Sequence, residues 1–276
     1  MTMKGVPQLR HAASGKRSRR MIAILELLTE RERVSLTEFS QTLGVSPATV
    51  RRDLADLDQQ RLLHRTHGGA EVIDSQAELP VALRNIQYLE AKRSIAQEVV
   101  RLIPTHRHAV ALSGGSTTAQ VARALAYHRD LTIITNSVTI ATLVSSYPNL
   151  KVIMTGGTLR PQSLELVGIL AENTFNAVNV GTAILGTDGI TAAGGVTTHD
   201  ETEARTNHAM VAHAQRTVVV ADGSKVGRLA MAKVADTDQI HALITDDTAA
   251  PEELAAIERA GVEVHVVRSR SAIVRN

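Results

Sequence analysis

The chain has 276 residues, of which 43% are hydrophobic, 21% are charged and none is cysteine. The absence of cysteine excludes disulfides, iron–sulfur clusters and thiolate-bound zinc, and with only two Phe, three Tyr and no Trp the chain lacks a base-stacking platform for single strands. The length predicts about two domains. The charge is uneven, +5 over residues 1–70 and −3 over the rest, which favours a polyanionic partner for the N-terminal part.

Three short helices are predicted within the first sixty residues. Apolar side chains at positions 21, 24, 25 and 28 have the spacing of one buried helical face. Ser35 and Glu38 have the spacing of a capping box, which would begin a second helix. Gly44 permits the positive φ of a tight helix exit, and Ser46 followed by Pro47 predicts the start of a third helix. Two helices joined by about three residues are typical of a helix-turn-helix.

The third helix would present a DNA-reading face opposite its apolar residues. Thr49 and Arg52 would reach base edges, whereas Arg51 and the helix N-terminus suit phosphates. A β-hairpin predicted around residues 67–69 would follow as a wing. The alternative is a plain three-helix bundle whose arginines are solvated. The residues expected at DNA are Ser46, Ala48, Thr49, Arg51, Arg52, Arg65 and His67.

Two runs in this part of the chain resemble the winged helix of DeoR-family bacterial transcription regulators. They are Val45-Ser46-Pro47-Ala48-Thr49-Val50-Arg51-Arg52-Asp53-Leu54 and Arg65-Thr66-His67-Gly68-Gly69-Ala70. The resemblance implies a recognition helix over about residues 46–57. We therefore expect a basic flexible arm over 1–16, a winged helix-turn-helix domain over 17–74, a linker over 75–90 and an α/β effector-sensing domain over 91–276.

Beyond the linker, helical patterns alternate with short β-branched runs. Strands are predicted at 109–112, 131–134, 151–154, 217–221, 242–245 and 263–267, with helices between them, among them 201–214 and 251–260. Strand–helix alternation with short links indicates an α/β sheet covered by helices. The run 198–201 is read as a capping box at the start of the helix over 201–214.

Small polar residues stand at five strand exits, those of four strands named above and one before residue 186, at the end of a parallel sheet where ligands bind. Gly114 and Gly115 lead into Ser116, Thr117 and Thr118 at a helix start, where glycines and free N–H groups favour an anion. Lys225 could add the charge that a phosphate requires. The alternative is that Gly, Asn and Asp simply occupy turns. The other four exits are Thr135-Asn136-Ser137, Thr155-Gly156-Gly157-Thr158, Gly186-Thr187-Asp188-Gly189 and Asp222-Gly223-Ser224-Lys225.

The order of these segments also resembles the DeoR sensor domain, whose fold is similar to ribose-5-phosphate isomerase, glucosamine-6-phosphate deaminase and CoA-transferase subunits. By that resemblance the loop over 115–118 and Lys225 hold a sugar phosphate, and the rest of the site is lined by Asn136, Gly156, Gly157, Asp188 and Glu203. Two positions depart from the family, which often has an acid where this chain has Ser113 and commonly a lysine where it has Asn207.

The sequence thus predicts a DNA-binding transcription regulator, a repressor of a carbohydrate-utilisation operon that a phosphorylated sugar releases. The expected partners are double-stranded operator DNA, a sugar-phosphate effector and a second copy of the chain. No cofactor, metal or membrane partner is expected, and no apolar run approaches the ~20 residues of a membrane helix, so we expect a cytoplasmic protein. The alternative is a phosphosugar isomerase or deaminase that carries a DNA-binding head, with Asp188, Glu203 and Lys225 as its acid–base set.

Overall fold

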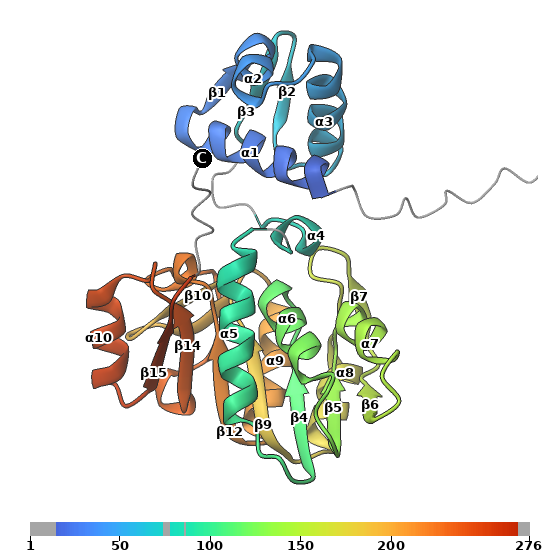
Figure 1. Ribbon diagram of the computed structural model, residues 1–276, viewed down its shortest axis with the longest axis vertical. Helices are drawn as coiled ribbons and strands as arrows, with labels where there is room; N and C mark the ends of the chain where they lie inside the picture. The colour runs from blue at the N-terminus through green and yellow to red at the C-terminus, as the bar shows by residue number, and fades with distance from the viewer. Residues whose placement is uncertain (1–14, 74–77, 86, 270–276) are drawn as a thin grey trace, which may run out of the picture. The chain divides into compact units, whose positions relative to one another are not determined.

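The computed structural model describes residues 15–73, 78–85 and 87–269. Its internal contacts divide the chain into two compact units, with the boundary in the sequence between Gln87 and Tyr88. Figure 1 shows the helices and strands of each unit. The expected basic arm lies outside the described residues, apart from its last two positions. No described helix is both long enough and apolar enough to cross a bilayer.

The N-terminal unit is a winged helix-turn-helix, as the sequence predicted. Its elements are α1 (Gly15–Arg31), β1 (Arg33–Ser35), α2 (Leu36–Leu43), α3 (Pro47–Gln59), β2 (His64–Thr66), β3 (Gly69–Glu71) and the short α4 (Val81–Arg84). The strands form a sheet in the order β1-β3-β2, all antiparallel. The strand β1 was not predicted. It pairs with β3 in the register that places Arg33 opposite Glu71, and these two side chains form an ion pair.

This unit has a core of its own. Phe39 of α2 and Leu57 of α3 are completely buried, and Ile24 and Leu28 of α1 pack in the same cluster. Leu83 of α4 belongs to that cluster too, so part of the segment that the sequence predicted as a linker is helical and packs on the N-terminal unit. The apolar residues whose spacing predicted the three helices therefore form the helix faces that pack together in this core.

The second unit is built on a seven-stranded parallel sheet in the order β15-β14-β12-β9-β4-β5-β6. These strands are β4 (His108–Leu112), β5 (Leu131–Thr135), β6 (Leu150–Met154), β9 (Val180–Gly186), β12 (Ala214–Val220), β14 (Ala242–Asp246) and β15 (Glu263–Val267). The strands predicted from sequence are confirmed to within three residues. The parallel pairing confirms that the five polar segments after β4, β5, β6, β9 and β12 lie at the same end of the sheet, where the strands have their carboxyl ends.

Helices cover both faces of this sheet, giving three layers (Figure 1). On one face α5 (Leu89–Leu102), α6 (Ser116–Leu125) and α7 (Val138–Val144) pack with alternate strand residues such as Val110 and Leu112. On the other face α8 (Ile169–Asn176), α9 (Glu201–Ala212) and α10 (Pro251–Arg259) pack with the intervening residues, among them Ala111. A sheet buried on both sides explains why its strands are continuous apolar runs.

Two small antiparallel sheets complete the second unit, and the sequence did not predict them. One is the hairpin of β7 (Thr158–Arg160) and β8 (Glu165–Val167), and the other is the sheet of β10 (Gly189–Thr191), β11 (Gly195–Thr198) and β13 (Ala232–Ala235). Each of these strands has three or four residues, too few to show an alternating pattern. The hairpin and β11 nevertheless supply side chains to the sensor site described below.

Candidate DNA interface and effector site

The geometry between α2 and α3 is set by three local signals. The side chain of Ser35 accepts the Glu38 N–H while Glu38 accepts the Ser35 N–H, so the predicted capping box is present. Gly44 ends α2 in the left-handed region at φ 61°, where glycine is favoured. Ser46 then caps α3 by accepting the Thr49 N–H, and Pro47 occupies the first helical turn. These contacts fix the turn between α2 and α3 without long-range help.

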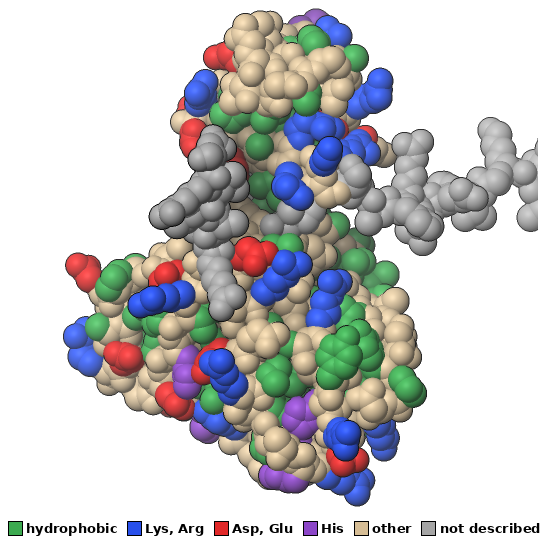
Figure 2. Space-filling view, in the orientation of Figure 1, with side chains coloured by type: hydrophobic (Ala, Val, Ile, Leu, Met, Phe, Trp, Pro, Cys, Tyr) green, Lys and Arg blue, Asp and Glu red, His purple; other side chains and the backbone are tan. Residues whose placement is uncertain are grey.

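The predicted DNA-contact residues lie on the surface of the N-terminal unit. Ser46, Ala48, Arg51 and Arg52 are exposed. Thr49 is half-buried, and its hydroxyl lies 3.0 Å from that of Ser46. In the wing, Arg65 and His67 are exposed. Figure 2 shows Lys and Arg side chains gathered over the N-terminal unit.

Arg17 and Arg20 belong to the basic N-terminal part, whose charge suggested a polyanionic partner, but in the structure they bind an acid of α3. Asp53 of α3 is 1% exposed and accepts from Nε of both Arg17 and Arg20 of α1. Arg17 also donates to Asp56, one turn further along α3. These cations therefore fasten α1 to α3, and the buried Asp53 faces α1 rather than solvent.

The candidate sensor site lies where the order of strands in the sheet changes direction. The chain builds β4, β5 and β6 outward and then returns to place β9 on the other side of β4, and such a switch point is where open parallel sheets bind ligands. Ser113 bridges the two strands there: it accepts the Gly186 N–H at 3.0 Å and donates to the Gly114 carbonyl. Its hydroxyl, at a position where the family often has an acid, is thus engaged by backbone.

The N-terminus of α6 has the form of an anion site. Gly115 is its N-cap at φ 119°, a conformation that side chains rarely allow. Ser116, Thr117 and Thr118 form the first turn and are buried, and the Thr118 hydroxyl donates to the Gly115 carbonyl. The backbone N–H groups of this turn and the Ser116 and Thr117 hydroxyls are the groups that could hold a phosphate.

A buried amide–carboxylate cluster lies beside this turn, and its acid was not predicted. Glu165 of β8 is 2% exposed and lies so close to Gly114 that a Cβ there would be 2.1 Å from its Oε1. Its Oε2 accepts from Asn136 Nδ2 at 2.9 Å and from Asn207 Nδ2 at 3.4 Å. Among the described residues, Oδ1 of Asn136 is buried with no hydrogen-bond partner. Asn207, which stands where the family commonly has lysine, belongs to this cluster.

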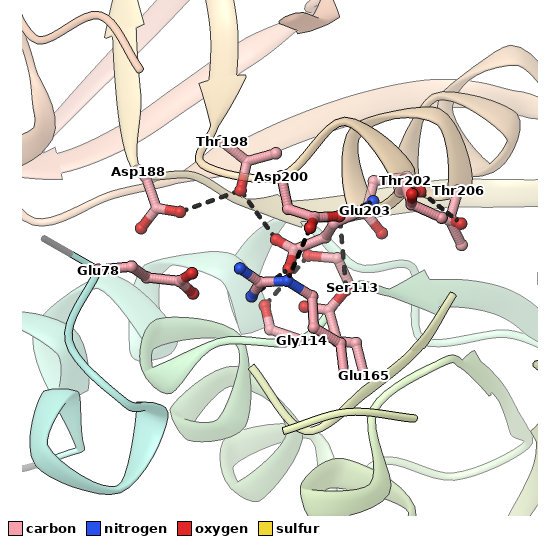
Figure 3. A network of polar contacts seen from close by, with 12 residues as sticks. Glu78, Ser113, Gly114, Glu165, Asp188, Thr198, Asp200, Thr202, Glu203 and Thr206 are labelled. Atoms are coloured by element: carbon pink, nitrogen blue, oxygen red, sulfur yellow. Dashed lines mark hydrogen bonds and ion pairs between the residues drawn. The ribbon is translucent and has the colours of Figure 1, made fainter. Parts of the chain in front are cut away.

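Two acids and a hydroxyl form a second cluster, shown in Figure 3. Thr198 Oγ1 lies 3.0 Å from Asp188 Oδ2 and 2.8 Å from Glu203 Oε1. Lys225 Nζ lies 3.7 Å from the other oxygen of Asp188, and Arg160 Nη1 lies 3.2 Å from Glu203 Oε2. The structure thus brings together three of the predicted site residues, Asp188, Glu203 and Lys225. It adds Arg160 and Thr198, which sequence reasoning missed.

Glu203 is an acid of this cluster whose pKa is raised above its ordinary value. Burial raises the pKa of Glu203, and the charge of Asp188 raises it further against the opposing effects of Arg160 and Thr198. One hydroxyl carries one proton, so Thr198 can donate to only one of its two carboxyl neighbours. A protonated Glu203 that donates to Thr198, which in turn donates to Asp188, satisfies all three groups.

The cap of α9 differs from the predicted one. Asp200, not Thr198, is the N-cap, and it accepts the Glu203 N–H at 2.8 Å. Arg160 Nε lies 3.3 Å from the same Asp200 side chain. Thr198 is therefore free of capping and takes part in the cluster with Asp188 and Glu203. The interpretation of residues 198–201 as a capping box was wrong.

Gly156 and Gly157 follow β6 and lead into the β7–β8 hairpin. Gly157 has φ 134°, and a Cβ there would lie 2.8 Å from the Val167 carbonyl oxygen, so packing against β8 requires glycine. Gly156 is exposed. The described contacts give Gly157 a structural role, and the place of both glycines in the effector site stays a prediction. Within the described residues no group of three or more metal-ligating side chains could hold a metal ion.

Comparison with known proteins gives two family matches that together span most of the chain. Residues 20–76 match the DeoR-like helix-turn-helix domain, and residues 87–247 match the DeoR C-terminal sensor domain. A putative aga operon transcriptional repressor of Escherichia coli O157:H7 is 36% identical over 91% of this chain and 94% of its own length. The HTH-type transcriptional regulator GlpR of Haloferax volcanii is 37% identical over 87% of this chain and 94% of its own. Ribose 5-phosphate isomerase A from Neisseria gonorrhoeae is similar at 17% identity, with a TM-score of 0.37, over 51% of this chain and 53% of its own.

The winged helix-turn-helix and the separate α/β unit define a two-domain transcription regulator. The DeoR-like matches cover more than half of the chain, and relatives above 30% identity cover nearly all of it. The chain belongs to the DeoR family of transcriptional regulators.

Proposed function

We propose that this regulator represses a carbohydrate-utilisation operon and that a phosphorylated sugar releases it from the operator. The observation that carries the proposal is the pairing of an exposed, capped recognition helix with a charged polar layer at the sheet's switch point. Relatives named as repressors of the aga operon and of the glycerol-3-phosphate regulon support the class of target. We place the DNA-binding domain at 17–74 and the sensor at 91–276.

The N-terminal unit reads DNA through α3. Thr49 and Arg52 meet base edges in the major groove, while Ser46, Arg51 and the start of α3 meet phosphates. Arg65 and His67 of the wing add backbone contacts. One such module makes few contacts, so the chain acts as a homo-oligomer on paired half-sites in the cytoplasm.

The effector binds along the edge of the sheet where β4, β5, β9 and β12 end. Its phosphate lies at the first turn of α6 and is paired with Lys225. Its hydroxyls meet Asp188 and Glu203, and the unpartnered Oδ1 of Asn136 accepts from a further hydroxyl. We expect the site to bind its ligand without turnover, with the Glu203 carboxyl group held in place by Thr198 and Arg160.

The DNA-reading part is tested by an operator selected from random DNA with the full chain. Arg52→Ala should weaken binding to that operator by about tenfold or more, since a bidentate base contact discriminates by about 1–3 kcal/mol. Arg93→Ala is the control, because Arg93 is an exposed arginine of α5 outside the N-terminal unit. If Arg52→Ala keeps the selected preference, the assignment of α3 as the reading helix is wrong.

The effector part is tested by thermal denaturation with a panel of sugar phosphates. A phosphate that raises the midpoint for the wild type should not do so for Lys225→Ala. Turnover of any panel member, abolished by Glu203→Gln, would instead establish the isomerase or deaminase alternative. An unchanged thermal response in Lys225→Ala would contradict the phosphate site.

A further inference from the structure

The side-chain amide of Asn136 is held by two acceptors, which fix the direction of each of its ends. Its Nδ2 group donates to Glu165 Oε2 at 2.9 Å and to Asn207 Oδ1 at 3.3 Å. An amide nitrogen carries two protons, so both donors of Asn136 are used. The oxygen of the same amide lies on the other side of its carbon atom and is therefore turned away from Glu165 and Asn207.

Glu165 is the member of this cluster that decides the orientation of the amide. A half-turn exchanges the donor and acceptor ends of an amide, so Asn136 and Asn207 alone could pair in either arrangement. A carboxylate accepts at both of its oxygens, and a half-turn of Asn136 would bring its Oδ1 against Glu165 Oε2. Asn207 Nδ2 donates to the same Oε2 at 3.4 Å, which sets the second amide in the matching direction.

The backbone around this cluster keeps the side chains together. The Leu166 N–H donates to the Asn136 carbonyl at 2.7 Å. Two residues further along, the Val138 N–H donates to the Leu164 carbonyl at 3.0 Å. The hairpin strand that carries Glu165 is therefore hydrogen-bonded directly to the segment that follows β5. The three side chains of the cluster are at most 3% exposed, so water does not compete for their hydrogen bonds.

The amide held in this way presents an acceptor that the protein does not satisfy. Asn136 is completely buried, and within the part of the chain that the structure describes no donor reaches its Oδ1. A buried acceptor without a donor is costly, and a ligand that donates to it removes that cost. Asn136 follows β5 at the carboxyl end of the sheet, and the neighbouring strand β4 leads into the first turn of α6. An occupant of the effector site therefore meets an acceptor here.

Asn207 makes this arrangement particular to the chain. The family commonly has a lysine at this position, and a lysine ammonium group donates but cannot accept. It could not take the second proton of Asn136 Nδ2, which Asn207 Oδ1 accepts here. The asparagine at 207 and the acid at 165 therefore act together on the Asn136 amide.

We propose that Glu165 is a positioning residue that sets which effector the site accepts. It holds Asn136 with the amide oxygen toward the ligand, so the site selects a phosphorylated polyol with a hydroxyl group at that point. The corresponding ketone is rejected, because its carbonyl oxygen cannot donate and would face another acceptor. This inference rests on the proposed function, because it specifies the class of sugar phosphate that the proposed effector site takes.

The selection is tested by calorimetric titration of the full chain with two pairs of open-chain phosphates. Glycerol 3-phosphate is compared with dihydroxyacetone phosphate, and ribitol 5-phosphate with ribulose 5-phosphate, so that one hydroxyl becomes a carbonyl within each pair. In at least one pair the alcohol should bind the wild type about tenfold more tightly than the ketone, or better.

The matched variants change only the acid. In Glu165→Gln the new amide can donate to Asn136 Oδ1 and lets Asn136 turn, so the preference for the alcohol should fall below about threefold. Glu258→Gln makes the same chemical change at an exposed acid of α10 and should keep the wild-type preference.

A second measurement needs neither a ligand nor a folded variant. In NMR spectra of the ligand-free wild-type chain, the Asn136 Nδ2 protons should show nuclear Overhauser contacts to the side chains of Glu165 and Asn207. Absence of these contacts overturns the proposal, as does a lack of preference for the alcohol in both pairs or an equal preference in Glu165→Gln. Failure of the proposed function would appear differently, as a wild-type chain that responds to no phosphate of either pair or of the thermal panel although the Asn136 contacts are present.

Discussion

The contact between α1 and the recognition helix makes a quantitative prediction for Asp53→Asn. The Asp53 carboxylate accepts charge-assisted hydrogen bonds from Arg17 and Arg20, and such bonds contribute about 1.5–3 kcal/mol each. The two arginine side chains are 32% and 19% exposed, so water weakens both interactions. We expect the variant to lower the free energy of unfolding of the N-terminal unit by about 2–3 kcal/mol.

The assay must separate the two units, because the chain as a whole need not unfold in one step. All three tyrosines lie in the second unit, so tyrosine fluorescence in urea reports on the sensor alone. Hydrogen exchange of residues 21–28 and 50–57 at increasing urea reports on the N-terminal unit. Asp53→Asn should lower the urea midpoint of exchange in these segments and leave the fluorescence midpoint unchanged.

Asp56→Asn is the matched control for this prediction. Asp56 lies on the same helix and shares Arg17, but its side chain is 43% exposed. An exposed pair contributes about 0–1 kcal/mol, so this variant should change the stability of the unit little. Equal losses in the two variants would refute the claim that the buried position of Asp53 fixes α3, as would no loss in Asp53→Asn.

Three further variants test other parts of the structure. Gly69→Ala places a Cβ 2.1 Å from a carbonyl oxygen of β1, so it should disrupt the wing sheet and weaken operator binding. Gly68→Ala is the control, because a Cβ there has no atom within 4 Å and operator binding should be unchanged. Equal operator affinities in the two variants would contradict this packing. Ser46→Ala removes the N-cap of α3 and should cost the N-terminal unit about 1 kcal/mol, measured by the same exchange experiment; no loss would exclude the cap as a stabilising contact. The raised pKa of Glu203 means that the folded chain binds a proton more tightly than the unfolded chain, so this group's contribution to the free energy of unfolding falls as pH rises above about 4.5. Glu203→Gln should flatten that decline between pH 5 and pH 8 in urea titrations followed by tyrosine fluorescence, and an unchanged slope would show that Glu203 ionises normally.

Local signals made the DNA-binding unit readable from the sequence. The capping box of Ser35 and Glu38, the left-handed Gly44 and the Ser46 cap act within a few residues, so their spacing alone specifies them. The pairing of Asp53 with Arg17 spans 36 positions and left no such signal. The net charge therefore suggested that Arg17 could contact DNA, whereas in the structure Arg17 pairs with Asp53 of α3.

The sensor site was predictable only as far as the parallel sheet dictates it. Asp188 and Lys225 follow strand ends, and parallel strands bring such residues to one edge. Arg160 and Glu165 come from a hairpin whose strands have three residues each, below the length at which periodicity shows. Positions 198–201 and 200–203 both have capping-box spacing, and only the tertiary contacts of Thr198 decide between them.

The two outermost strands of the sensor sheet bear on how copies of this chain could assemble. β6 carries the exposed Lys151, and β15 carries Glu263 and His265, which contact each other. Charged side chains on edge strands oppose the strand pairing that would extend a sheet into a neighbouring molecule. A second copy of the chain would then have to join through helix or loop surfaces instead of extending the sheet.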